Sequence, residues 1–129
     1  MKLHYESIAD FGYEKLSNVI RDDKRATAYK STNILADKIN KAANTAFKGY
    51  VALSEENKVC GFVMFTGDES SPTITDAFTC EHFIGKGFFK TILSFMKDSG
   101  FAKPAIVVDD NASDMKKFIS EYGVEQVWV

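Results

Sequence analysis

Two glycines separated by one residue, Gly85 and Gly87, stand between an alternating stretch and an amphipathic one. Residues 73–80 have the alternation and β-branched content of a strand, and residues 88–99 carry apolar side chains at helical spacing. In such a strand–loop–helix, glycines let backbone N–H groups converge, and the helix N-terminus adds partial positive charge. The sequence therefore predicts that residues 84–89 bind a phosphate-bearing ligand.

The composition predicts one ordinary globular domain over residues 1–129, with 45% hydrophobic and 26% charged residues. The net charge of −2 argues against non-specific binding of nucleic acid, which requires a positive surface. No apolar run has the length of a signal peptide or of a membrane span, so we expect a cytoplasmic protein without membrane contact. We find no metal-ligand cluster, and we expect Cys60 and Cys80 to be buried free thiols, with a disulfide or reactive site as the alternative.

The expected elements position this loop between a front half and a back half. The front half should hold a strand at 2–8, a helix capped by Asp10, a helix opened by Ser31 or Thr32, and a hairpin of 50–53 with 59–65. The back half should hold the strand 73–80, the helix after the glycines with Gly100 as its cap, a strand at 104–108 buried on both faces, a helix from Asn111 or Ser113 to Gly123, and a strand at 126–129.

This element order resembles the GCN5-related N-acetyltransferase (GNAT) superfamily. Two further stretches carry the resemblance: 107–111, Val-Val-Asp-Asp-Asn at a strand end, and 118–124, which is similar to the helix end of the family. The resemblance implies an α/β fold in which a mixed, mostly antiparallel sheet is flanked by helices in the order β-α-α-β-β-β-α-β-α-β. It also implies acetyl-CoA as the co-substrate, with no metal.

The glycine loop matches the coenzyme A loop of the family in two registers. One register places Gly87 on the first required glycine, which leaves Ile84 where the family has Arg or Gln and Phe89 where it has Gly or Ala. The other places Gly85 and Gly87 on the two glycines and His82 on the Arg/Gln position. By position, the residues implied to bind the coenzyme are Ala77, Phe78, Thr79, Ile84, Gly85, Lys86, Gly87, Phe88, Phe89 and Asn111.

Acetyl transfer to an amine requires a base for the amine, a donor to the thioester carbonyl and an acid for the leaving thiolate. Asp76 on the central strand is the first candidate for the base, and His82 is the next. In the family that this chain resembles, the acid is usually a tyrosine. Ile119 occupies that position here, so the resemblance makes Tyr122, one turn further on, the candidate substitute. The acceptor would be an amine of a small molecule or of a protein.

Three functions remain open from the sequence. The first is an acetyl-CoA-dependent N-acetyltransferase. The second, favoured by Ile84, Phe89 and Ile119, is a degenerate binding or accessory protein similar to short members of this superfamily in phages. The third is a generic α/β protein whose glycines only begin a helix. A homodimer through the apolar edge of the strand at 126–129 is a further expectation.

Overall fold

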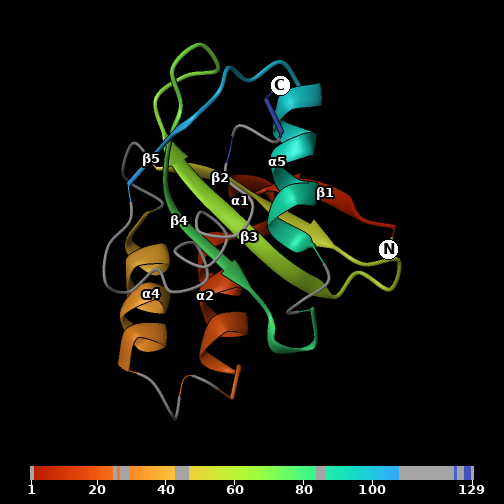
Figure 1. The fold of residues 1–129 in the computed structure, drawn as a ribbon. Coiled ribbons are helices and arrows are strands. Elements are labelled where there is room, and N and C mark those ends of the chain that lie inside the picture. Colours follow the sequence, from red (N-terminus) through yellow and green to blue (C-terminus); the bar gives the residue numbers. More distant parts are fainter. Residues whose placement is uncertain are drawn as a thin grey trace.

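The computed structural model describes residues 2–24, 26, 30–42, 47–83, 87–107, 124, 127 and 128 (Figure 1). Their elements follow in the order β1 (His4–Ser7), α1 (Ile8–Phe11), α2 (Tyr13–Arg21), α4 (Lys30–Lys41), β2 (Lys48–Leu53), β3 (Val59–Thr66), β4 (Thr73–Thr79), the 3-10 turn η2 (Glu81–Phe83), α5 (Phe88–Asp98) and β5 (Ala105–Ile106). No helix in these ranges is long and apolar enough to cross a membrane.

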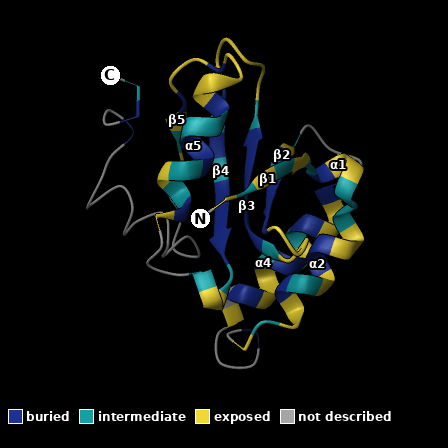
Figure 2. Ribbon diagram, turned by 90° about the vertical axis from the view of Figure 1, so that its right-hand side faces the viewer, coloured by how far each residue is buried: buried dark blue, intermediate teal, exposed yellow. Residues whose placement is uncertain are grey.

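The strands form one mixed sheet in the order β1-β2-β3-β4-β5. The first three pairings are antiparallel and the last, between β4 and β5, is parallel. Helices α1, α2 and α4 cover one face of the sheet and α5 covers the other, so the most deeply buried strands lie between two helical layers (Figures 1 and 2). This architecture confirms the predicted mixed α/β class.

Each face of the sheet has its own core, and alternation along β3 divides the side chains between them. Phe62 and Met64 belong to the cluster under α2 and α4, whereas Val63 and Phe65 belong to the cluster under α5. All four are 3% exposed or less. Their alternation explains why period two in the sequence predicted the β2–β3 hairpin correctly.

The first helical region is broken, which the sequence did not indicate. Ser7 rather than Asp10 caps α1, because its Oγ accepts the Asp10 backbone N–H at 3.1 Å. Gly12, at φ 111°, then separates α1 from α2. The single helix capped by Asp10 is therefore wrong, since a left-handed φ at Gly12 cannot continue a helix.

The helix α4 was predicted at nearly the right place but with the wrong opening. It already includes Lys30, so neither Ser31 nor Thr32 stands at its start. At the end of α5, Gly100 has φ 99°, which confirms it as the residue that stops this helix.

The strand β5 differs from its prediction. Ala105 is exposed, Val107 is 54% exposed, and β5 is the last strand of the described sheet. An unbroken apolar run therefore did not indicate burial on both faces here. Cys60 is a buried free thiol as expected, whereas the free thiol of Cys80 is only half-buried.

The helix predicted from Asn111 or Ser113 to Gly123 lies outside the described residues. Further on, the backbone N–H groups of Val127 and Trp128 both donate to the Val124 carbonyl, at 3.0 and 3.1 Å. That is a turn, so the strand predicted at 126–129 is wrong at these two residues. The homodimer expected through it stays a prediction.

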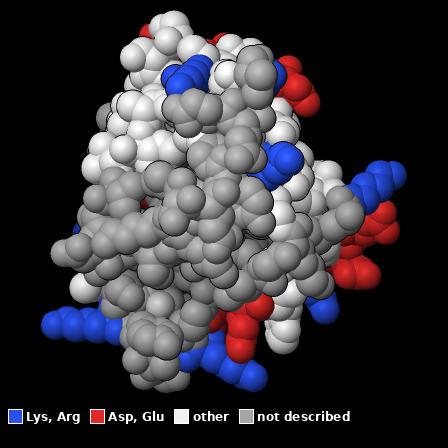
Figure 3. All heavy atoms as spheres, viewed as in Figure 1, with Lys and Arg blue, Asp and Glu red and all other residues white. Residues whose placement is uncertain are grey.

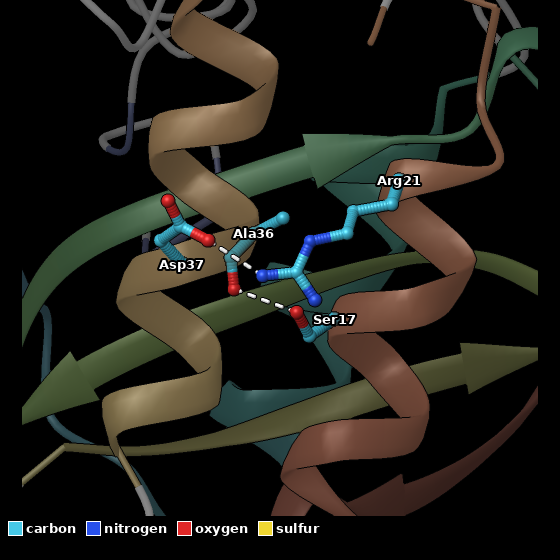
Figure 4. A network of polar contacts seen from close by, with 4 residues as sticks. All are labelled: Ser17, Arg21, Ala36 and Asp37. Atoms are coloured by element: carbon cyan, nitrogen blue, oxygen red, sulfur yellow. Dashed lines mark hydrogen bonds and ion pairs between the residues drawn. The ribbon is translucent and has the colours of Figure 1, made fainter.

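Two contacts hold α2 against α4 (Figure 4). The buried Ser17 hydroxyl donates to the Ala36 carbonyl at 2.8 Å, a bond that contributes about 1 kcal/mol. Arg21 and Asp37 form an ion pair whose side chains are 38% and 61% exposed, so its contribution is about 0–1 kcal/mol. Together they position the middle of α4 over the sheet.

An aromatic group under α5 gives the protein a predicted alkaline sensitivity. Tyr5 stacks on Phe95 with ring centroids 4.0 Å apart, and Tyr50 meets the same ring edge-on at 5.1 Å. Burial raises the pKa of both tyrosine hydroxyls above 10.0, helped by Cys60 at Tyr5 and by Glu69 at Tyr50.

The unfolded chain therefore ionises these tyrosines first, and the free energy of unfolding should fall as the pH rises above about 10. We expect Tyr5→Phe/Tyr50→Phe to lose less stability than the wild type between pH 9 and 11, in urea titrations at a series of pH values. Parallel curves for the two proteins would contradict the prediction.

Candidate functional site

A β-bulge in β4 shapes the candidate site. Along β3, neighbouring Met64 and Phe65 pair with Asp76 and Ile74, so Thr75 is an extra residue in β4. Bulges of this kind redirect side chains and are common beside active sites. Ile74 packs in the core under α5, whereas Phe78 packs in the core under α2 and α4, so the face reverses between them.

The bulge also directs the backbone of Ala77 toward the β5 side of β4. The Cys80 N–H donates to the Cys60 carbonyl at 2.9 Å, so these two residues form a hydrogen-bonded pair. The register is unbroken from this pair to Met64 and Asp76, and Ala77 lies three positions along it, opposite Val63. Because bonded and non-bonded pairs alternate in an antiparallel ladder, the N–H and C=O of Ala77 point away from β3. These two groups therefore face the side of β4 on which β5 lies.

Within the described residues, β5 pairs with β4 only at its beginning. The paired residues are Thr73 with Ala105 and Ile74 with Ile106, and the Val107 N–H donates to the Ile74 carbonyl at 3.0 Å. Among the described residues, the parallel pairing reaches Ile74 and not the bulge that follows it. The Ala77 backbone lies beyond this pairing, at an edge of the described sheet where an extended ligand could add hydrogen bonds.

Asp76 is a buried carboxylate next to that edge. Its side chain is 9% exposed and points to the α4 side of the sheet, where Lys38 Nζ lies 2.8 Å from Oδ2. Apart from this ion pair, the buried Oδ2 accepts no hydrogen bond from the described residues.

Lys38 reaches Asp76 from the last turn of α4. Its side chain is 36% exposed, and its ammonium also lies over the Phe47 ring, 5.1 Å from the centroid. The Tyr13 hydroxyl donates to the Phe47 backbone carbonyl at 3.0 Å. A carboxylate, an ammonium and an aromatic face thus meet under α4.

The predicted coenzyme loop is described only at its end. Gly87 has φ 73° and precedes α5, whose first turn has no side-chain cap. A Cβ built at Gly87 would meet no heavy atom within 4 Å among the described residues. Backbone N–H groups at the start of this helix fit the phosphates of a coenzyme.

The other predicted site residues fall into three groups. Phe88 is buried, and Phe89 is half-buried with its ring 5.4 Å from that of Phe88, so both pack on the core under α5. His82 is exposed in η2, past the end of β4 and on the order of 10 Å along the strand from Asp76. Five lie outside the described residues: Ile84, Gly85, Lys86, Asn111 and Tyr122.

The pairing of Asp76 with Lys38 was not predicted. The two residues are far apart in the sequence, and no pattern in it links them. No local signal could have identified the pair, because the register of β4 and the placement of α4 decide it.

Charges elsewhere do not gather in one patch on the described part of the face in Figure 3. Lys and Arg side chains lie beside Asp and Glu side chains around its rim. The described residues also hold no group of three or more His, Cys, Asp or Glu side chains that could bind a metal ion.

Comparison with known proteins adds to this geometry. No family model matches the sequence, and no curated protein sequence matches it either. Solved structures do match. A ribosomal-protein-alanine N-acetyltransferase from Brucella melitensis biovar Abortus 2308 superimposes with a TM-score of 0.63 at 13% identity, over 93% of this chain and 90% of that one.

Two other matching structures are acetyltransferases named for different substrates. An aminoglycoside acetyltransferase from an uncultured soil metagenomic sample has a TM-score of 0.57 at 20% identity, over 92% of this chain and 85% of that one. Mutant forms of the spermidine/spermine N-acetyltransferase of Vibrio cholerae superimpose with a TM-score of 0.56 at 17% identity, over 95% of this chain and 79% of that one. These likenesses extend over nearly the whole chain, and the protein has the fold of the GNAT acetyltransferases.

Proposed function

We propose that the protein is an N-acetyltransferase that transfers the acetyl group of acetyl-CoA to a primary amine. The observation that carries the proposal is the bulge at Thr75, which directs the Ala77 backbone to the edge of β4 and the Asp76 carboxylate to the α4 side. A hydrogen-bond donor and a buried carboxylate are thereby brought to adjacent residues. Acetyl transfer to an amine needs both.

Acetyl-CoA supplies an acetyl thioester. The Ala77 N–H donates to the thioester carbonyl and stabilises the negative charge that develops on its oxygen. The edge from Ala77 to Thr79 orients the pantetheine arm, and the start of α5 at Gly87 binds the phosphates through backbone N–H groups. The fold of the neighbouring acetyltransferases supports this arrangement.

Asp76 orients the acceptor amine and accepts its proton, directly or through one water molecule. Its burial keeps water from competing for the carboxylate. The proton for the departing thiolate would come from Tyr122, which remains a sequence-based assignment. Amine acceptors are consistent with the two neighbours whose names specify an N-acetyltransferase.

A titration with acetyl-CoA tests the proposal. At 100 times its dissociation constant a ligand stabilises the native state by about 2.7 kcal/mol, which corresponds to a rise in Tm of about 10 °C for a domain of this size. Thiol release with a panel of primary amines should follow. No shift at millimolar acetyl-CoA would overturn the proposal, and binding without amine-dependent thiol release would favour the degenerate accessory protein.

Variants of Gly87 separate backbone strain from ligand binding. Gly87→Ala and Gly87→Glu each place a side chain at φ 73°, which costs about 1 kcal/mol of stability, and the Cβ of either meets no described neighbour within 4 Å. We expect Gly87→Ala to retain the acetyl-CoA shift and Gly87→Glu to abolish it, because the new carboxylate repels the phosphates. Equal shifts in both variants would place the phosphates elsewhere.

A further inference from the structure

The Lys38 ammonium occupies a small site of unusual composition. It lies 2.8 Å from the buried Asp76 Oδ2 and 5.1 Å from the centroid of the Phe47 ring. A carboxylate and an aromatic face are the two groups that bind ammonium ions in proteins. In the free protein, the cation in this site is therefore the ammonium group of Lys38.

Two features show that Lys38 holds the site from a partly exposed position. Asp76 Oδ2 is buried and depends on the Lys38 ammonium, because it accepts no hydrogen bond from any other described residue. The Lys38 side chain is also 36% exposed, against 9% for Asp76. The carboxylate is thus fixed in the fold, while its partner stands on a long, partly hydrated side chain that can swing out.

The backbone next to the aromatic wall is held independently of Lys38. The Tyr13 hydroxyl, from α2, donates to the Phe47 carbonyl at 3.0 Å. Neither this hydrogen bond nor the pairing of Asp76 in β4 involves the Lys38 side chain, so both can persist if that side chain withdraws.

We propose that Asp76 and the Phe47 ring form a binding site for a primary alkylammonium group, which Lys38 fills in the free protein and the acceptor amine takes over. The proposal rests on the proposed function for its acceptor. It names the substrate class, a primary alkylamine that is cationic when it binds. It also makes Lys38 a competitor of that amine rather than a catalytic residue.

Competition has a measurable consequence. An external ammonium binds only while Lys38 is withdrawn, so its apparent dissociation constant exceeds the intrinsic one by the inverse of the withdrawn fraction. Removal of the Lys38 charge abolishes this factor. Lys38→Met keeps most of the aliphatic length of the side chain, and we expect it to bind a small alkylammonium at least about tenfold more tightly than the wild type.

The test uses n-butylammonium chloride, which reproduces the lysine side chain, in thermal-shift titrations at constant ionic strength. Lys38→Met should show a saturable rise in Tm that the wild type shows only at higher concentration. Lys41→Met, an exposed lysine of the same helix, should behave as the wild type. Neutral n-butanol should give no saturable shift, and Lys38→Met/Asp76→Asn should lose the response to n-butylammonium.

A second variant keeps the proposal testable if Lys38→Met does not fold. Lys38→Arg retains the charge and binds a carboxylate through two N–H groups, so it should weaken n-butylammonium binding below that of the wild type. Equal titrations for Lys38→Met, Lys38→Arg and Lys41→Met would overturn the proposal. None of these measurements contains acetyl-CoA, so their failure is distinct from failure of the proposed acetyl transfer.

Discussion

Asp76→Asn is expected to lower kcat/KM for acetyl transfer to a primary amine by about 10²–10⁴-fold. Asparagine has nearly the same shape but can neither accept the proton of the amine nor attract its charge. The fold should persist, because Lys38 is 36% exposed and can hydrate when it loses its partner. Thiol release at a series of amine concentrations measures the effect.

The matched control is Asp98→Asn, which changes an exposed carboxylate at the end of α5. We expect wild-type rates from this variant. Acetyl-CoA binding should be unchanged in both variants, since the Asp76 side chain points to α4 and Asp98 lies at the far end of α5 from Gly87. An Asp76→Asn variant that binds acetyl-CoA and retains the wild-type rate would remove Asp76 from the mechanism.

Gly61→Val is expected to lower the free energy of unfolding by about 3 kcal/mol. Gly61 lies in β3, where a Cβ would stand 2.3 Å from the Phe78 carbonyl oxygen and 2.7 Å from Cζ of Phe88. Strand propensity predicts the opposite sign, because valine favours strands and glycine does not. The packing of β4 and α5 decides against propensity here, and urea unfolding measures the outcome.

Two companion variants test this reason. Gly61→Ala should cost less, because alanine adds no atoms beyond Cβ. The double variant Gly61→Val/Phe88→Ala should lose less stability than the sum of the losses of the two single variants, because the Phe88 ring that meets the valine is absent from it. Additive losses would show that the Phe88 ring does not cause the clash.

Local sequence patterns predicted the elements whose signals are local. Period two identified the hairpin of β2 and β3, and helical spacing together with Gly100 bounded α5. The errors arose where one sequence pattern was compatible with two local structures. Asp10 and Ser7 are both good capping residues, and an apolar run such as 104–108 suits an edge strand as well as an interior one.

The candidate site was predicted only in part for the same reason. The position of Asp76 in the central strand followed from the order of the elements. Its burial did not, because a carboxylate on a strand is more often exposed to solvent, whereas Asp76 is 6% exposed. The Lys38 contact had no sequence signal at all.

The sequence by itself determined the succession of strands and helices, the apolar face of each, and the family that this order resembles, because spacing along the chain encodes these properties. Only the tertiary structure decided the extra residue at Thr75, the side to which Asp76 points and the ammonium that meets it. A bulge depends on how two strands pair, and an ion pair between β4 and α4 depends on how two layers pack. Neither depends on residues that are neighbours in the sequence.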